Sequence, residues 1–377
     1  MTNQPLPVAV IGAGGFGGNT LQALAGMDSV KIVGVSDRRQ EAARRAAREA
    51  GAAAFTDNRS LLAEAKPAAV FLAVPPPAAG DIIAACAKRG IHVWKELPLA
   101  RNLGEGLEFV RRMHAAEAVF SVGTQRRFAT GYSRARELQG WLGQLFLARG
   151  HYLFNWGPDL GWRADRSAGG GALLELGYHI VDLLVSMLGL PEEVYGSGVC
   201  GANCAGRSLS PTPYDTEDTA AALLRFRDGC MGSMVTTRVS GPVSEGLALH
   251  GSDGSVVADS ETCIVRDPDG NVLDRVGDDQ ATPMQVFRRQ AEHFVNAVGT
   301  GAKRYECSGW ENLLNLAVID AIYLSERTSQ PESPARLLAT HGIDAEQCLA
   351  LRPPTLSQER LEPHTPAEPD GENRVAD

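Results

Sequence analysis

Residues 8–17 read VAVIGAGGFG, a fully apolar run that leads directly into a glycine-rich segment. The apolar run predicts a buried strand, and the glycines fit the pattern G-x-G-x-x-G between that strand and a helix. Glycines at these positions permit a tight turn and a close approach of the backbone to a pyrophosphate, which then lies at the helix N-terminus. We therefore interpret the segment as a dinucleotide site, with the candidate cofactor-binding residues Gly12, Gly14, Phe16 and Gly17.

An acidic residue follows the glycines at the spacing that selects the cofactor. Asp37 lies twenty residues past Gly17, at the end of a second apolar run at 31–35. A carboxylate there binds the ribose hydroxyls of NAD and repels the 2′-phosphate of NADP. Arg38 and Arg39 could accommodate that phosphate, so the sequence favours NAD and leaves NADP open.

The same alternation continues outward from this segment to residue 124. Helical stretches rich in Ala and Arg separate further short apolar runs, which predict strands at 69–74, 91–94 and 119–122. Short apolar strands that alternate with helices are typical of a parallel sheet covered by helices. Residues 1–124 are therefore predicted to form an α/β domain, a Rossmann dinucleotide-binding domain.

The pattern changes after residue 125. Turn dipeptides separate β-rich runs at 219–226, 232–239 and 246–250, and helices are predicted at 171–188, 286–298 and 310–325. Closely spaced strands joined by turns favour an open, largely antiparallel sheet, so residues 125–330 are predicted to be an α+β domain. Residues 331–377, rich in Pro and polar side chains, are predicted to be a C-terminal extension with a disordered tail from about residue 353.

Composition and charge narrow the function classes. The chain has 377 residues, 44% hydrophobic and 21% charged, with a formal net charge of −9. Nucleic-acid-binding proteins normally carry a basic surplus, so we expect no nucleic-acid partner. Residues 1–27 lack a basic n-region and are interrupted by glycines, so we expect no signal peptide and no membrane partner. The cysteines are scattered, with Cys200 and Cys204 as the only close pair, which indicates reduced thiols in a cytoplasmic protein and no metal site.

The helix expected at 171–188 carries three ionisable groups on an otherwise apolar surface. Glu175, His179 and Asp182 are spaced i, i+4 and i+7 and share one face of an α-helix. Burying them together is costly unless they are paired or functional. Three interpretations stay open: a self-satisfied structural cluster, a metal site that lacks an obvious fourth ligand, and a catalytic group. In the catalytic interpretation His179 accepts or donates the proton of a substrate hydroxyl. Glu175 orients the imidazole or helps to bind a neighbouring hydroxyl, and Asp182 anchors the helix or helps to bind substrate.

Aromatic and cationic residues gather between 149 and 166, among them Trp156, Trp162 and Arg163. Such groups can stack on sugar faces and hold hydroxyls or a carboxylate. An ordinary surface loop is the alternative. We take Trp162 and Arg163 as candidate substrate-binding residues.

Several ordered motifs resemble the glucose–fructose oxidoreductase / inositol dehydrogenase / MocA family over about residues 6–330. The matching segments are AVPP at 73–76, GIHVWKELPLA at 90–100, GTQRRF at 123–128, GGGALLELGYHIVD at 169–182, EDT at 217–219 and GWE at 309–311. The resemblance implies that the second domain binds substrate and forms a homo-oligomer, a dimer or a tetramer, through its open sheet. It also implies that Val74, Pro75, Glu96 and Gln125 contact the cofactor.

Two positions depart from the family's pattern. Leu97 stands where the family has the catalytic lysine of Glu-Lys-Pro, and Glu175 replaces the signature Asp. In an extended segment Lys95 would project to the same face as Leu97, about 6–7 Å along the chain. Lys95 is therefore a candidate catalytic residue, with an ordinary solvated or cofactor-flanking lysine as the alternative.

The resemblance implies an NAD(P)-dependent oxidoreductase that transfers a hydride between nicotinamide and a secondary alcohol of a sugar, cyclitol or related polyol. Relatives that also lack the lysine suggest an alternative, an NAD-dependent glycoside hydrolase that transiently oxidises the sugar, eliminates the leaving group and reduces the sugar again. A third hypothesis is a nucleotide-binding protein that has lost catalysis. Leu97 argues for it, and His179 with Glu175 argues against it.

Overall fold

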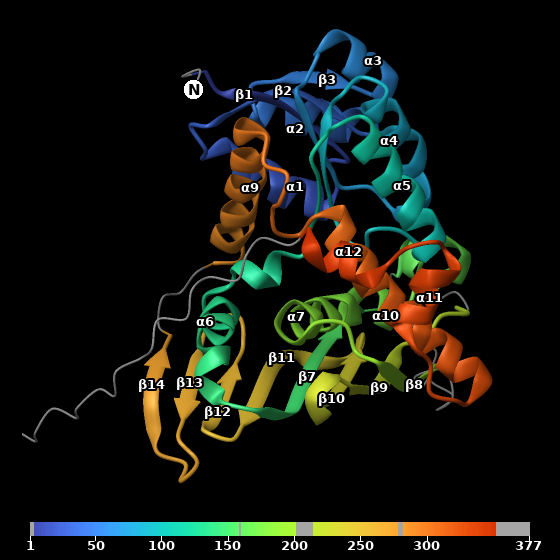
Figure 1. Ribbon diagram of the computed structural model, residues 1–377. Helices are drawn as coiled ribbons and strands as arrows, with labels where there is room; N and C mark the ends of the chain where they lie inside the picture. Colours follow the sequence, from blue (N-terminus) through green and yellow to red (C-terminus); the bar gives the residue numbers. More distant parts are fainter. Residues whose placement is uncertain (1–3, 158–159, 201–213, 278–281, 352–377) are drawn as a thin grey trace, which may run out of the picture.

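The computed structural model of the protein describes residues 4–157, 160–200, 214–277 and 282–351. Its N-terminal part is a six-stranded parallel sheet with the order β3-β2-β1-β4-β5-β6 (Figure 1). The strands are β1 (Leu6–Ile11), β2 (Val30–Ser36), β3 (Ala53–Phe55), β4 (Ala69–Leu72), β5 (His92–Lys95) and β6 (Phe120–Val122). The order reverses at β1, as in a Rossmann fold, and confirms the predicted α/β class.

Helices cover both faces of this sheet: α1 (Gly15–Ala25), α2 (Gln40–Glu49), α3 (Asn58–Glu64), α4 (Ala79–Ala87) and α5 (Leu103–Ala115). Side chains alternate along each strand and fill two cores. Val8 and Val10 of β1 enter one core together with Phe71 of β4, whereas Ala9 and Ile11 enter the other. Because both faces are buried, the strands read as continuous apolar runs in the sequence.

The second part is an eight-stranded sheet with the order β14-β13-β12-β11-β7-β10-β9-β8. Neighbouring strands are antiparallel except β7 and β10, which are parallel. The strands are β7 (Leu145–Asn155), β8 (Glu193–Val199), β9 (Thr219–Arg225), β10 (Met231–Thr237), β11 (Val239–Gly251), β12 (Gly254–Ala258), β13 (Cys263–Arg266) and β14 (Val272–Val276). The mostly antiparallel sheet confirms the predicted α+β class of this part.

Helices α6 (Thr130–Leu138), α7 (Tyr178–Leu188) and α10 (Gly309–Thr328) lie on one face of this sheet (Figure 1). The segment Arg166–Leu188, which contains α7, is long and apolar enough to cross a membrane, but 89% of its most apolar window is buried inside the protein. It is therefore a core helix. The other face exposes large apolar side chains, among them Tyr195, Leu223 and Val235. The predicted homo-oligomer stays a prediction, for which this face is the expected contact surface.

The chain returns to the first sheet after completing the second. Helix α9 (Pro283–Thr300) packs against α1, and its Phe287 and Phe294 enter the core that contains Val8 and Phe71. The sequence assigned this helix to the domain of residues 125–330, whereas in space it completes the nucleotide-binding domain. An amphipathic pattern shows that one helix face is buried but not which sheet buries it.

The first part of the C-terminal extension is folded. Helices α11 (Pro334–Thr340) and α12 (Ala345–Ala350) pack against α10, and Leu338 and Cys348 are buried in the main core. The tail predicted to be disordered from about residue 353 lies outside the described residues, and so does Cys204.

Candidate active site

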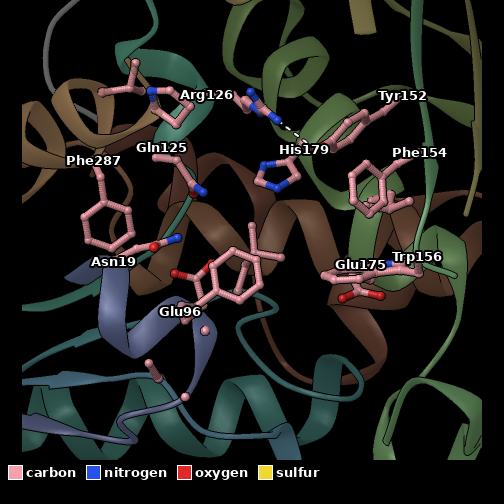
Figure 2. A pocket seen from close by; sticks show the side chains of 18 of the residues that line it. Asn19, Glu96, Gln125, Arg126, Tyr152, Phe154, Trp156, Glu175, His179 and Phe287 are labelled. Atoms are coloured by element: carbon pink, nitrogen blue, oxygen red, sulfur yellow. Dashed lines mark hydrogen bonds between the residues drawn. The ribbon is translucent and has the colours of Figure 1, made fainter. Parts of the chain in front are cut away.

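A cavity of about 690 Å³ is lined by residues of both parts of the fold. Its walls come from the glycine loop before α1, the ends of β4 and β5, the strand β7, the turn before α7 and the start of α9 (Figure 2). The ends of β4 and β5 are carboxyl ends of parallel strands beside the point where the strand order reverses, which is where ligands bind in such sheets. The cavity gathers ten of the predicted site residues: Gly14, Phe16, Val74, Pro75, Glu96, Gln125, Trp162, Arg163, Glu175 and His179.

The glycine loop has the geometry that a pyrophosphate needs. A Cβ atom on Gly12 would lie 2.1 Å from the carbonyl oxygen of Ala73, and one on Gly17 would lie 1.8 Å from the carbonyl oxygen of Gly12. Gly12 also has a φ of +95°, a conformation that favours glycine. A Cβ on Gly14 would have no atom within 4 Å, so the loop is open there, directly before α1 begins at Gly15. These residues fit a dinucleotide, whose phosphates can approach the open backbone and the helix N-terminus.

Asp37 follows β2 and contacts the glycine loop. Its carboxylate accepts hydrogen bonds of 2.9 Å from the backbone N–H groups of Ala13 and Arg39. Burial raises the pKa of Asp37, but these hydrogen bonds and the Arg39 guanidinium outweigh burial and hold the pKa below its usual value. The carboxylate is therefore ionised at neutral pH and has acceptor sites left for ribose hydroxyls. Arg38 and Arg39 are exposed.

We expect NADH to bind more tightly than NADPH by about tenfold, equivalent to about 1.4 kcal/mol, because Asp37 accepts ribose hydroxyls and repels a 2′-phosphate. Quenching of tryptophan fluorescence during titration with each cofactor measures the two affinities. The isosteric variant Asp37→Asn removes only the charge and should narrow the difference. Equal or reversed affinities in the wild type would show that Arg38 and Arg39 decide the choice.

The residues after β4 and β5 form the cavity wall nearest the glycine loop. Val74 and Pro75 follow β4, and Glu96 and Leu97 follow β5. Burial raises the pKa of Glu96 to about 8, so its carboxyl is mostly protonated at neutral pH. Within the described residues, neither Oε2 of Glu96 nor Oε1 of Gln125 has a hydrogen-bond partner, although both atoms are buried. Unpaired polar groups beside a cavity are suited to bind a ligand, and both of these groups line the same cavity as the glycine loop.

Lys95 does not line the cavity, which corrects its assignment as a candidate catalytic residue. The residue is 1% exposed, and Nζ donates to the carbonyl oxygens of Glu96 at 2.9 Å and of Pro98 at 2.5 Å. Burial lowers the pKa of Lys95 to about 8. The expected projection beside Leu97 required an extended segment through both residues, but β5 ends at Lys95. The ammonium group therefore holds the loop after β5, and only Leu97 of the two side chains borders the cavity.

His179 faces the cavity from the first turn of α7. The residue is 8% exposed, and its ring lies edge-to-face with that of Tyr152, with 5.7 Å between ring centroids. Burial, together with the nearby Arg126 guanidinium, lowers the pKa of His179 well below its usual value, so the imidazole is neutral at neutral pH. Its Nδ1 has no hydrogen-bond partner in the part of the chain that the structure describes. A neutral imidazole at a cavity can accept the proton of a bound hydroxyl.

Glu175 is paired with Arg163 rather than with His179, which corrects the expectation that it orients the imidazole. Nε of Arg163 donates to Oε1 of Glu175. The guanidinium carbon lies 3.9 Å from the ring centroid of Trp156 and 4.8 Å from that of Trp162. Burial raises the pKa of Glu175, and the charge of Arg163 opposes the rise. Glu175 therefore orients a cation that is stacked between aromatic rings at the cavity wall.

Asp182 lies outside the cavity, which corrects its assignment to substrate binding. Its carboxylate accepts hydrogen bonds of 2.6 and 2.7 Å from Arg127 and one of 2.7 Å from Asn315. Arg127 also donates to Glu311 at 2.6 Å. The three residues were expected on one helix face, but the turn Leu173–Gly177 that contains Glu175 is π-helical. Asp182, three residues after His179 in α7, contacts Arg127 and does not line the cavity. Asp182 therefore belongs to a buried structural network. Across the described residues, no group of three or more His, Cys, Asp or Glu side chains could hold a metal ion.

Arg126 and three aromatic residues of the cavity were not among the candidate site residues, although the aromatic residues lie in the segment 149–166 that the sequence singled out. Arg126, in the turn after β6, forms an ion pair with Glu245 and donates to the hydroxyl of Tyr152 at 2.8 Å. Every second residue along the end of β7 is aromatic and faces the cavity (Figure 2): Tyr152 and Phe154 lie in the strand, and Trp156 directly follows it. Aromatic residues at alternate positions indicate a strand, but no strand was predicted for this segment. The start of α9, which closes one side, has the helix-start signals of a Thr282–Gln285 capping box and Pro283 at the first position, but these signals do not reveal that it borders a cavity.

Two family models match the chain. The model described as "Oxidoreductase family, NAD-binding Rossmann fold" matches residues 6–124, and the model described as "GFO/IDH/MocA C-terminal domain" matches residues 132–257. The two matches cover the first sheet and most of the second, and thus most of the cavity walls.

Named relatives agree with these matches. Levoglucosan dehydrogenase of Pseudarthrobacter phenanthrenivorans is 28% identical over 251 residues, which are 60% of this chain but only 64%, less than two thirds, of that protein. Myo-inositol 2-dehydrogenase of Thermotoga maritima is 26% identical over 265 residues, 68% of this chain and 77% of that protein. A solved structure of levoglucosan dehydrogenase in complex with NADH and levoglucosan aligns with a TM-score of 0.78 and 23% identity over 88% of this chain and 99% of that chain. This structural likeness shows that the fold is shared.

Proposed function

The chain belongs to the GFO/IDH/MocA family of oxidoreductases and contains its NAD-binding Rossmann domain, and from this premise we propose that it dehydrogenates a secondary alcohol of a sugar, cyclitol or related polyol. The observation that carries the proposal is the neutral imidazole of His179 in the same cavity as the open glycine loop. The names of the two relatives, a levoglucosan dehydrogenase and a myo-inositol dehydrogenase, support a cyclic polyol as the substrate.

The cofactor would be held by the glycine loop, by Asp37 and by the wall that contains Val74 and Glu96. When bound, NAD supplies an acceptor for the hydride of the carbinol carbon. His179 takes the proton of the hydroxyl, because its lowered pKa leaves the imidazole deprotonated at neutral pH. Burial and the Arg126 charge both disfavour the imidazolium form, which keeps His179 in the neutral form that accepts a proton.

The other end of the cavity suits a ring with several hydroxyl groups. Phe154, Trp156 and Trp162 offer aromatic faces on which the apolar face of a sugar can pack. Arg163 offers charge-assisted hydrogen bonds to hydroxyls, in an orientation that Glu175 fixes. The cavity volume of about 690 Å³ lies within the usual range for small-molecule sites.

The proposed reaction is tested by following NADH absorbance while the protein and NAD⁺ are incubated with a panel of sugars, cyclitols and glycosides. We expect NADH and an oxidised product to accumulate together with at least one cyclic polyol. Release of an aglycone from a glycoside, read in a second channel while NADH stays constant, would replace the proposal by the glycoside hydrolase alternative. Binding of NADH with neither signal across the panel would favour a protein that has lost catalysis.

A further inference from the structure

The phenol of Tyr152 is placed at the reacting end of the cavity. The residue lies on β7, is 9% exposed and borders the cavity beside His179. Figure 2 shows the two rings together with the Arg126 side chain, which reaches the Tyr152 hydroxyl. A substrate hydroxyl that gives its proton to His179 must therefore come close to the phenol as well.

The hydroxyl of Tyr152 has a free proton. Its oxygen accepts from Nη2 of Arg126 at 2.8 Å, which directs the O–H bond elsewhere, and no acceptor for this O–H is found among the described residues. Burial raises the pKa of the phenol against the influence of Arg126, so the group keeps its proton at neutral pH. Tyr152 can thus donate a hydrogen bond to a ligand but does not act as a base.

Arg126 supplies positive charge to the cavity wall beside Tyr152. Its guanidinium is fixed by the ion pair with Glu245 and lies 5.0 Å above the Tyr152 ring. The other cation of the cavity wall in the described residues, Arg163, is paired with Glu175 and stacked on Trp156, whereas Arg126 contacts Tyr152. A phenol that accepts a hydrogen bond from a guanidinium becomes a stronger donor through its own O–H, because hydrogen bonds in a chain polarise one another.

We propose that Tyr152 is a catalytic residue that donates its phenolic O–H to the oxygen interconverted between alcohol and carbonyl, with Arg126 as its positioning residue. The assignment rests on the proposed function. In the oxidation, a hydride leaves the carbinol carbon for NAD⁺, the hydroxyl proton passes to His179, and the phenolic proton stays on Tyr152. The hydrogen bond strengthens as negative charge develops on the reacting oxygen, and so it lowers the barrier.

The test removes one oxygen atom. In Tyr152→Phe we expect kcat to fall by about 10²-fold, the usual loss for one oxyanion donor, while NADH affinity and the melting temperature stay at wild-type values. Binding of the best polyol to the NADH-loaded protein, measured by calorimetry without turnover, should weaken much less than kcat. Tyr195→Phe, the same change on the exposed outer face of β8, is the matched control and should leave all four quantities unchanged.

Substitutions of Arg126 separate positioning from a general effect on folding. At pH 8 His179 is neutral with or without the Arg126 charge, because burial is the larger cause of its lowered pKa. At this pH Arg126→Gln should lower kcat as Tyr152→Phe does, Arg126→Lys should restore part of it, and the double variant should be no slower than Tyr152→Phe. If Tyr152→Phe does not fold, the kcat values of the Arg126 variants still test whether Arg126 and Tyr152 assist the reaction.

Three results would overturn the proposal. Wild-type kcat in Tyr152→Phe would exclude the donor role and leave the proposed function intact. A parallel loss of melting temperature, NADH binding and kcat in all these variants would show a structural role. A wild type without turnover on the whole panel would remove the proposed function and this assignment with it.

Discussion

His179→Ala is expected to lower kcat by about 10²–10⁴-fold, the usual contribution of a general acid–base group. The affinity for NADH should stay within twofold of the wild type, because the glycine loop and Asp37 belong to the first sheet and His179 to a helix on the second. Steady-state kinetics and a fluorescence titration of NADH measure the two effects on one preparation. His151→Ala changes another histidine of the same domain, outside the cavity walls, and should leave kcat unaltered.

The pH dependence of kcat/KM tests the role of His179 independently. Burial and the Arg126 charge lower the pKa of His179 well below its usual value of 6.5. A base acts in its deprotonated form, so kcat/KM for alcohol oxidation should keep its plateau at pH 6.5 and fall only at lower pH, through the lowered pKa. A half-maximal point at or above pH 6.5 would contradict this environment. A His179→Ala protein that melts early or loses NADH would point instead to the structural interpretation of the helix.

The cofactor half of the molecule follows closely from local sequence. The apolar run before Gly12, the glycine spacing and the distance to Asp37 are consequences of contacts within one βαβ unit, and the structure places each of these residues as expected. Such features are short-range, so the residues that create them also reveal them. Helix α9 shows where this reasoning ends, because its packing partner lies far away in the sequence.

The substrate half was only partly predictable because it depends on backbone detail. The π-helical turn before α7 is not visible in the residue pattern, and it changes the position of Glu175 relative to His179 and Asp182, which lie in the regular helix α7. The end of β5 at Lys95 is equally hidden, and it decides that the ammonium binds two backbone carbonyls. The sequence grouped these side chains by spacing, whereas the structure turns Lys95 away from the cavity at a strand end and binds Asp182 to Arg127 outside the cavity.

Arg127→Met is expected to destabilise the protein by about 3–5 kcal/mol, the usual cost of removing one partner from a buried ion pair. The guanidinium is 2% exposed and neutralises the carboxylates of Asp182 and Glu311, which are 1% and 4% exposed. Without it, the positive charge that pairs with Asp182 and Glu311 is lost while both acids stay buried. Urea denaturation followed by circular dichroism measures the loss, and Arg112→Met is the matched control. It breaks the exposed pair with Glu108, whose side chains are 48% and 57% exposed, and should cost less than about 1 kcal/mol.

The same network predicts the sign of a pH effect. Burial already raises the pKa of Asp182 against the attraction of Arg127, and removing the arginine raises this pKa further. A group whose pKa is raised by folding binds its proton more tightly in the folded state, so stability is lost as the pH rises through the folded pKa. The loss of unfolding free energy caused by Arg127→Met should therefore be smaller at pH 5 than at pH 8. If Arg127→Met or Asp182→Asn keeps wild-type stability but raises KM for the polyol, Asp182 belongs to the substrate site after all. If stability falls and KM stays unchanged, Asp182 belongs to the network that holds α7 against α10.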